Sequence, residues 1–165
     1  MNTIEKIPSE LDIEIRQSKI SDVGEINELE KMVFSPKIRY GPSLIVAIIN
    51  TSLPHLALTA ELKHQKKIIG FIAGEIDERI DLLGRIITIE VDPNFQNHKI
   101  GEQLLHEFEK NIVDHYSVDR LELQVHVTNH AAIAFYKKHG YFEVKKLKNY
   151  YSRKEHAILM QKDIK

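Results

Sequence analysis

The chain has 165 residues, 42% hydrophobic and 28% charged, which suffices for one hydrophobic core, and its formal net charge of −1 predicts no nucleic-acid or anionic-membrane partner. The absence of cysteine excludes disulfides, thiol catalysis and cysteine zinc sites, and no apolar run approaches the roughly 20 residues that span a bilayer. We therefore expect a cytoplasmic protein with a single domain over residues 1–165, in which 1–11 form a loose N-terminal extension, and nothing indicates an oligomer.

The first half of the chain predicts an edge strand, two helices and a hairpin. Alternation at 13–16 indicates the strand. Apolar residues at helical spacing from Val23 to Val33 indicate the first helix, and Leu44 to Ile49 indicate the second. The segments 56–62 and 67–76, on either side of a polar turn, are typical of two hairpin strands.

In the second half, strands alternate with helices. We expect strands at 86–91, 120–127, 141–144 and 156–162, and helices at 100–115 and 129–139. A meander followed by such alternation predicts an α/β protein with a mixed central sheet and helices on both faces.

The most informative loop, residues 96–102, joins the β-branched strand 86–91 to the amphipathic helix that begins at Ile100. The first amides of a helix have no intrahelical partner, and the helix dipole is positive there. A tight loop that leads into such a helix is a typical site for a phosphate.

This loop resembles the acetyl-CoA loop of the GCN5-related N-acetyltransferases (GNAT), whose pattern is Arg/Gln-x-x-Gly-x-Gly/Ala. Gln96 and Gly101 match the first and last places, whereas Lys99 stands where the family usually has glycine. A left-handed conformation at Lys99 would cost roughly 1–2 kcal/mol. A phosphate paired with its ammonium would offset part of that cost.

The segment 123–141 resembles the second cofactor motif of the same family nearly residue for residue. Asn129 is a favourable N-cap after a strand, and Gly140 is a typical C-terminal stop. Because the predicted element order is also that of the family, the resemblance covers almost the whole chain. It implies the GNAT (acyl-CoA N-acyltransferase) fold and acetyl-CoA as co-substrate.

The resemblance also implies roles for individual residues. The Asn129 side chain would contact the pantetheine arm, and the Tyr136 hydroxyl would lie near the thioester sulfur and protonate the departing thiolate. Peptide groups of the preceding strand would hold pantetheine. The expected cofactor-binding residues are Ile89, Val91, Gln96, Asn97, His98, Lys99, Ile100, Gly101, Glu102, Asn129 and Tyr136.

The general base is open at this point. In related enzymes the base position is Glu or His, but here it is Gln124, which does not titrate. Strand alternation puts Glu122 and His126 on the same face as Gln124. His126, acting through a water, and Glu90 on the neighbouring strand are the two leading candidates, ahead of Glu122.

The acceptor side resembles that of the protein N-terminal acetyltransferases, including the bacterial ribosomal-protein-alanine enzymes. In that branch paired tyrosines contact a substrate peptide, which suggests this role for Tyr150 and Tyr151. Phe34 and Tyr40 would form the opposite wall of the groove. The histidines lack the spacing of a metal site, so no metal is expected.

We therefore expect direct acetyl transfer from acetyl-CoA to the α-amino group of a protein or peptide. Two alternatives stay open. One is an acetyltransferase for a small amine such as a polyamine. The other is a non-catalytic acetyl-CoA-binding regulator, for which Lys99 and Gln124 are the motivation.

Overall fold

The computed structural model describes residues 11–77 and 83–164, so the expected extension at 1–11 lies almost entirely outside the described residues. The strands are β1 (Ile13–Gln17), β2 (Ala57–Leu62), β3 (Lys67–Asp77), β4 (Leu83–Val91), β5 (Arg120–His126), β6 (Phe142–Ser152) and β7 (Glu155–Asp163). The helices are α1 (Val23–Val33), α2 (Pro42–Thr51), α3 (Ile100–His115) and α4 (His130–Lys138). Short 3-10 turns precede α1 and follow β4.

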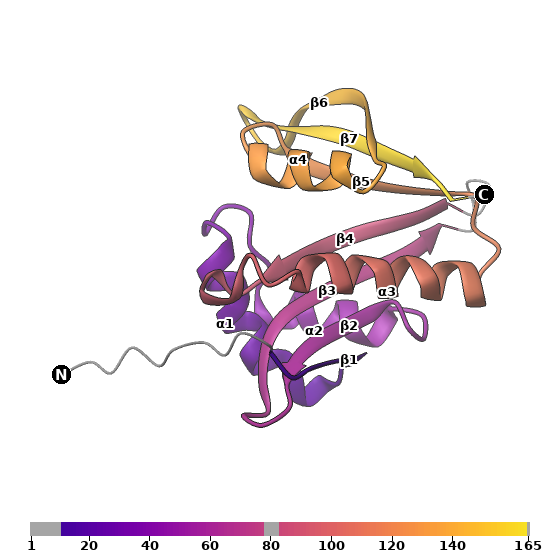
Figure 1. The fold of residues 1–165 in the computed structure, drawn as a ribbon. Coiled ribbons are helices and arrows are strands. Elements are labelled where there is room, and N and C mark those ends of the chain that lie inside the picture. The colour runs from indigo at the N-terminus through magenta and orange to yellow at the C-terminus, as the bar shows by residue number, and fades with distance from the viewer. Residues whose placement is uncertain (1–10, 78–82, 165) are drawn as a thin grey trace.

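One mixed seven-stranded sheet, in the order β1-β2-β3-β4-β5-β7-β6, runs through the molecule. Among the strands of the described residues, β4 and β5 are the one pair that runs parallel. Figure 1 shows α3 and α4 in front of the sheet and α1 and α2 behind it. Two apolar cores correspond to the two faces: one holds Leu104 and Phe108 of α3, and the other holds Ile26 and Ile45 of α1 and α2. The predicted mixed sheet with helices on both faces is confirmed.

Most predicted elements have close counterparts, and helix α3 has the predicted bounds. The strand predicted at 141–144 was too short, because β6 continues to Ser152 along β7. Its lysine-rich sequence is exposed on both faces, so it lacks the alternation that marks a half-buried strand. Such charges are common on edge strands, where they discourage pairing with another chain. No described helix is long and apolar enough to cross a membrane.

Strands β4 and β5 diverge, and this divergence positions the candidate site. They pair only from Leu83↔Arg120 to Ile86↔Leu123. The next residue, Ile87, is a β-bulge. Thr88 pairs with Ala73 and Ile86 pairs with Gly74, so Ile87 has no partner residue on β3. A bulge of this kind bends a strand. The strands are together on the right of Figure 1 and apart on the left, so residues 87–91 have a free edge toward β5.

The close approach of α3 to this part of the sheet depends on Gly74. A Cβ at this position would lie 2.3 Å from Phe108 Cζ and 2.6 Å from the Arg85 carbonyl oxygen. Only glycine leaves space for the Phe108 ring beside the bulge. Helix α3 is thereby held against β3 and β4, with its N-terminus near the end of β4.

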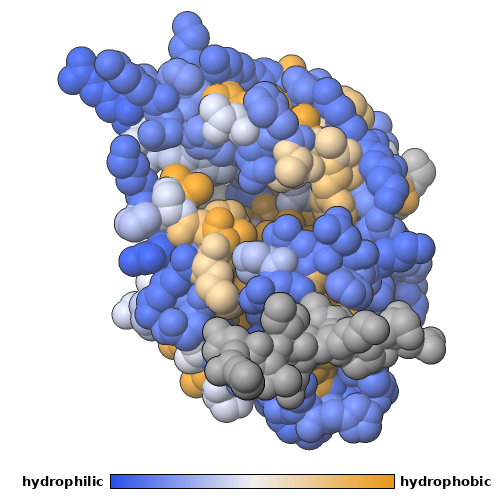
Figure 2. Space-filling view, turned by 60° about the vertical axis from the view of Figure 1, so that its left-hand side comes forward, coloured by the Kyte–Doolittle hydropathy of each residue, from blue (hydrophilic) through white to orange (hydrophobic). Residues whose placement is uncertain are grey.

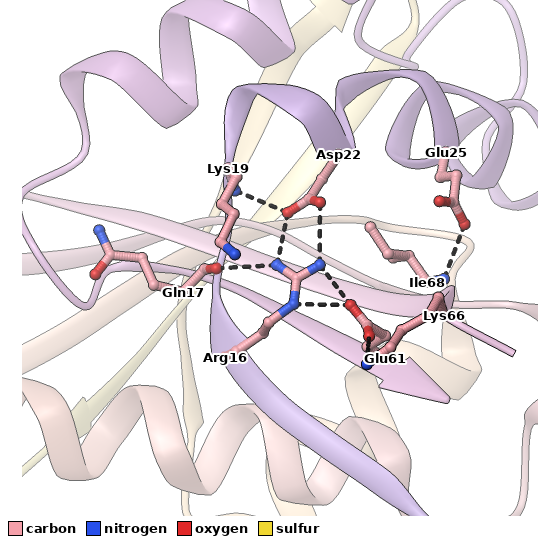
Figure 3. Close-up of polar contacts among 8 residues, drawn as sticks. All are labelled: Arg16, Gln17, Lys19, Asp22, Glu25, Glu61, Lys66 and Ile68. Atoms are coloured by element: carbon pink, nitrogen blue, oxygen red, sulfur yellow. Dashed lines mark hydrogen bonds and ion pairs between the residues drawn. The ribbon is translucent and has the colours of Figure 1, made fainter. Parts of the chain in front are cut away.

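An ion-pair cluster joins β1 to the start of α1 and to β2 (Figure 3). The Arg16 guanidinium donates to both Asp22 oxygens at 2.8 and 3.0 Å and to Glu61 Oε2 at 2.8 and 2.6 Å. The same Asp22 carboxylate accepts from the Lys19 amide and so stabilises the turn before α1. Although burial alone would raise the pKa of Asp22, the Arg16 bonds hold it below its usual value, and they do the same for Glu61.

We predict that Arg16→Met lowers the free energy of unfolding by about 3 kcal/mol at pH 7, because it removes the salt-bridge partner of the buried Asp22 carboxylate and leaves Glu61 with only the exposed Lys66, 3.4 Å away. Urea denaturation measures the loss. The lowered pKa values mean that this stabilisation exists above the unfolded-state pKa values and disappears as the pH falls below about 4. The difference between wild type and variant should therefore narrow in acid.

The matched control is Lys31→Met, which breaks the exposed pair with Glu28. It should cost less than about 1 kcal/mol. Equal effects of the two substitutions at pH 7 would contradict the role given to Arg16.

Candidate active site

The gap between β4 and β5 contains a cavity of about 110 Å³. Several of the predicted site residues meet there, namely Phe34, Tyr40, Ile89, Gln124, His126, Asn129, Tyr136 and Tyr151. Figure 2 turns the open end of the gap forward and shows apolar surface gathered around a central hollow. Residues from α1, from the loop before α2 and from β4, β5, α4 and β6 thus share one site.

The 96–102 loop has the geometry expected of an anion-binding turn. Lys99 is the N-cap of α3 and is left-handed, with φ 60° and ψ 17°, and Asn97 also has positive φ, at 66°. The first α3 bond runs from the Gln103 amide to the Lys99 carbonyl, at 3.0 Å. The amides of residues 100–102 precede that bond and are available to a ligand at the helix start.

Side chains of this loop have separate contacts. The Glu102 carboxylate pairs with Lys138 of α4 and so joins the two helices. The His98 ring is held within the loop by the Gln96 carbonyl, 3.0 Å from Nδ1. Lys99 and Glu102 border a shallow surface hollow on the β1 side, which is distinct from the cavity between the strands. The loop therefore offers backbone amides at the helix start and an exposed ammonium at its edge.

Asn129 and Tyr136 lie at the α4 wall of the cavity. Asn129 Oδ1 accepts from the Ala132 amide at 3.1 Å, so Asn129 is the N-cap that the sequence predicted. Tyr136 is 5% exposed, and its ring lies edge-on to Tyr141 at 5.5 Å. Burial raises the pKa of the Tyr136 phenol well above its ordinary value, so the hydroxyl keeps its proton at neutral pH.

Both nitrogens of His126 have partners. Nε2 lies 2.6 Å from Glu155 Oε2, and Nδ1 lies 2.8 Å from Thr128 Oγ1. The neighbouring Glu122 pairs with Arg85 at 2.8 Å. Gln124, at the position where related enzymes have a base, accepts from the Tyr150 hydroxyl at 3.2 Å. On this strand neither His126 nor Glu122 presents a free proton acceptor.

Glu90 is only 2% exposed and lies on the α1 side of β4. Its carboxyl group meets that of Glu30, a residue of α1 that is 1% exposed and lines the cavity. Burial, and then the charge of Glu30, raise the pKa of Glu90 to about 10. Glu90 is therefore protonated at neutral pH.

A larger outer cavity of about 560 Å³ adjoins the inner one. Tyr40 and Tyr151 border both cavities, and Tyr150 borders the outer one. The Tyr151 hydroxyl donates to the Gln124 carbonyl at 3.2 Å, which together with the Tyr150 bond holds the tyrosine pair over β5. Apolar residues of α2, including Leu44 and Ile48, form the opposite wall of this groove.

Sequence reasoning missed Glu30 as a site residue. It lies on the predicted apolar stripe, one residue after Leu29, and a charged residue on a buried helix face was the available signal. Ile38 and Thr88 also line the cavity, but nothing in their type or spacing distinguishes them from ordinary loop and strand residues. Within residues 11–77 and 83–164, no group of three acidic or histidine side chains is arranged to hold a metal ion.

We predict that Lys99→Gly yields a more stable protein than Lys99→Ala, by about 1 kcal/mol, because glycine adopts positive φ without the Cβ penalty. Both substitutions remove the ammonium, so the difference between their free energies of unfolding reports the backbone conformation at position 99 alone. Urea denaturation of the two variants measures it.

The same two substitutions at Lys110, an exposed residue in the interior of α3, serve as the control. There glycine should be the less stable choice by about 1 kcal/mol. If Lys99→Ala proved the more stable variant at the loop as well, Lys99 would not be held left-handed.

Comparisons with known proteins agree with this geometry. The family model described as acetyltransferase (GNAT) family matches residues 26–141. An uncharacterized N-acetyltransferase of Methanocaldococcus jannaschii is 31% identical over 148 residues, which cover 90% of each chain. An N-alpha-acetyltransferase of Saccharolobus solfataricus is 24% identical over 172 aligned residues, covering 93% of this chain and 94% of the relative.

Among solved structures, Naa20 of Chaetomium thermophilum in complex with a bisubstrate analogue has a TM-score of 0.75 and 26% identity. The match covers 91% of this chain and 86% of that one. The sheet order, the diverging parallel strands and the match over residues 26–141 together lead to one conclusion. This chain belongs to the acetyltransferase (GNAT) family.

Proposed function

We propose that this protein transfers an acetyl group from acetyl-CoA directly to the α-amino group of a protein or peptide N-terminus. The observation that carries the proposal is a pair of adjoining cavities beside the diverging strands β4 and β5, which share Tyr40 and Tyr151 in their walls. The loop before α3 lies outside one end, and the tyrosine-lined groove lies at the other. A donor and an acceptor entering from these ends would meet beside Tyr136.

The residues on the donor side fit acetyl-CoA. The amides of residues 100–102 suit a pyrophosphate, and the free edge of β4 at 87–91 suits the amides of a pantetheine arm. Asn129 would border that arm. When bound, acetyl-CoA supplies an activated acetyl thioester.

For transfer, Tyr136 would hold its proton until the thiolate departs, and its raised pKa keeps the donor form fully populated at neutral pH. Backbone amides near Val91 would polarise the acetyl carbonyl.

The acceptor side suits a chain rather than a compact amine. The inner cavity is small, and it opens past Tyr40 into a groove several times larger. Phe34 and Tyr40 on one side and Tyr150 and Tyr151 on the other provide rings for apolar contact and hydroxyls for the peptide backbone. An α-amino group in the inner cavity would leave the following residues in the outer groove.

The names of similar proteins support the same acceptor. The Saccharolobus solfataricus relative is an N-alpha-acetyltransferase, and Naa20 was solved with a bisubstrate analogue. A small-amine acetyltransferase is the second candidate and would use the inner cavity alone. A non-catalytic acetyl-CoA-binding regulator is the third, suggested by Lys99 and by Gln124 at the family's base position.

One assay separates the three candidates. Thiol release from acetyl-CoA is measured with short peptides bearing free N-termini, with the same peptides blocked at the N-terminus, and with polyamines. We expect turnover of free peptides and none of blocked ones. Turnover restricted to polyamines would contradict the proposal, and tight acetyl-CoA binding without turnover of any amine would favour the regulator.

We predict that Tyr136→Phe lowers kcat by more than about tenfold and leaves acetyl-CoA affinity nearly unchanged, because it removes the proton donor but keeps the ring. Steady-state kinetics and calorimetric titration measure the two quantities. Tyr116→Phe, which removes a hydroxyl bonded to the Pro54 carbonyl outside the cavity, is the matched control. An unchanged kcat in Tyr136→Phe would remove this residue from the acid role.

A further inference from the structure

Two acidic side chains are buried against each other next to the inner cavity. Glu30 is 1% exposed and Glu90 is 2% exposed, on facing elements α1 and β4. Glu30 Oε1 and both Glu90 oxygens accept no hydrogen bond from any donor of the described residues. Carboxyl groups without a cation are rarely buried, so this pair requires an explanation.

The pair is stable only if it holds a proton. Two adjacent buried carboxylates repel each other, and burial disfavours both charges, so one proton is retained between them. Glu90 is the member that keeps it, with its pKa raised to about 10 by burial and by the neighbouring charge of Glu30. Burial also raises the pKa of Glu30 above its usual value, and hydrogen bonds from the Tyr40 amide and from protonated Glu90 offset part of that rise.

Glu30 is the member that faces the cavity. Its Oε2 accepts from the Tyr40 amide at 2.9 Å, which fixes the carboxyl group and leaves Oε1 available. Glu30 lines the inner cavity, whereas Glu90 does not. Glu30 thus places a buried, oriented carboxylate, with one oxygen that accepts no hydrogen bond, in the wall of the cavity where an acceptor amine would lie.

Few other charges act on this pair. Arg39, in the loop before α2, stabilises the charge of Glu30, and Tyr40 is protonated with a pKa raised to about 12. From the sheet, Glu75 of β3 and Tyr150 of β6 act on Tyr40, while α2 carries no ionisable side chain. Among these groups no cation forms a salt bridge with Glu30 or Glu90.

We propose that Glu30 binds the α-ammonium group of the acceptor and takes its proton, and that Glu90 is the neutral positioning residue that keeps Glu30 ionised. This inference rests on the proposed function and deepens it. Before the acceptor binds, Glu30 and Glu90 share one proton, and the pair has a net charge of −1.

One N–H bond of the ammonium breaks, an O–H bond forms on Glu30, and the amine keeps the electron pair. The neutral amine then attacks the acetyl carbon, the C–S bond breaks, and the thiolate takes a proton from Tyr136. The proton that the attacking nitrogen loses restores Tyr136, and the proton on Glu30 returns to solvent.

This assignment differs from the two bases favoured by the sequence. His126 has both nitrogens engaged, by Glu155 and Thr128. Glu90 itself is protonated at neutral pH and does not line the cavity. Glu30 combines an oxygen that accepts no hydrogen bond, burial and a place in the cavity wall.

The test compares two Gln substitutions that should differ in the size of their effect on kcat/KM and in the pH–rate profile. Glu30→Gln should lower kcat/KM by more than about 100-fold and abolish the acidic limb of the pH–rate profile. Glu90→Gln should lower kcat/KM by less than about tenfold and leave the acidic limb of the pH–rate profile in place, because the side-chain amide of the new glutamine still donates a hydrogen bond to Glu30. Glu90→Leu removes that donor, so the pKa of Glu30 should rise and the limb should move to higher pH. Glu28→Gln, on the exposed side of α1, is the matched control.

A second readout needs neither substrate nor cofactor. Carbon-13 NMR of glutamate carboxyl groups in the full chain, assigned with the two Gln variants, should show Glu90 protonated and Glu30 ionised at pH 7. A carboxylate signal for Glu90 at pH 7 would overturn the proposal. It would also be overturned if His126→Gln, rather than Glu30→Gln, removed the acidic limb.

The outcomes distinguish this inference from the proposed function. If wild type acetylates only polyamines, the peptide acceptor is wrong, and the Glu30 and Glu90 variants are then compared on the polyamine. If wild type acetylates peptides but Glu30→Gln keeps its rate and its acidic limb, the proposed function stands and the role of Glu30 is wrong.

Discussion

The structure depends on the loss of pairing between β4 and β5 beyond Ile86 and Leu123. A closed sheet would satisfy every backbone group of β4 and leave no space for a ligand. The bulge at Ile87 bends β4 away, and Gly74 lets Phe108 hold α3 against the bent region. The cost is that the peptide groups of 87–91 that face β5 have no strand partner, although β3 still pairs with the other edge. An extended ligand with amides of its own can satisfy them. The divergence thus creates both the cavity and an edge of peptide groups open to a ligand.

Buried carboxyl groups have two contrasting environments in this structure. Asp22 and Glu61 are ionised because Arg16 bonds to both, and this cluster joins β1 and β2 to the start of α1. Glu30 and Glu90 are as deeply buried but have no salt-bridge partner among the described residues, so they retain a proton. The first arrangement stabilises the fold. The Glu30–Glu90 pair instead destabilises the folded state once the pH exceeds the pKa of a glutamate in the unfolded chain. Buried ionisable groups with such strongly shifted pKa values are frequent at functional sites.

Much of the fold was predictable because it depends on local patterns. The bounds of α3 follow from apolar spacing, and the Asn129 cap and the Gly140 stop follow from residue type. The left-handed backbone considered for Lys99 is also present, although lysine has no preference for it.

Other features depend on contacts between distant residues and could not be predicted. The bulge at Ile87 arises from register against β3, and the full length of β6 arises from pairing with β7. The meeting of Glu30 with Glu90 requires α1 to cross β4. For the same reason, the sequence pointed to His126 but did not reveal that Glu155 and Thr128 occupy its nitrogens. Element types are therefore largely encoded locally, whereas the partners of polar side chains are set by the tertiary fold.

The central claim is that the free edge of β4 and the start of α3 together hold the donor. Amide hydrogen exchange of the full chain, with and without acetyl-CoA, tests it directly. We expect added acetyl-CoA to slow exchange at residues 87–91 and 100–103, with little change in β1 and β2. Protection confined to other segments, or none at 87–91 under saturating acetyl-CoA, would contradict it.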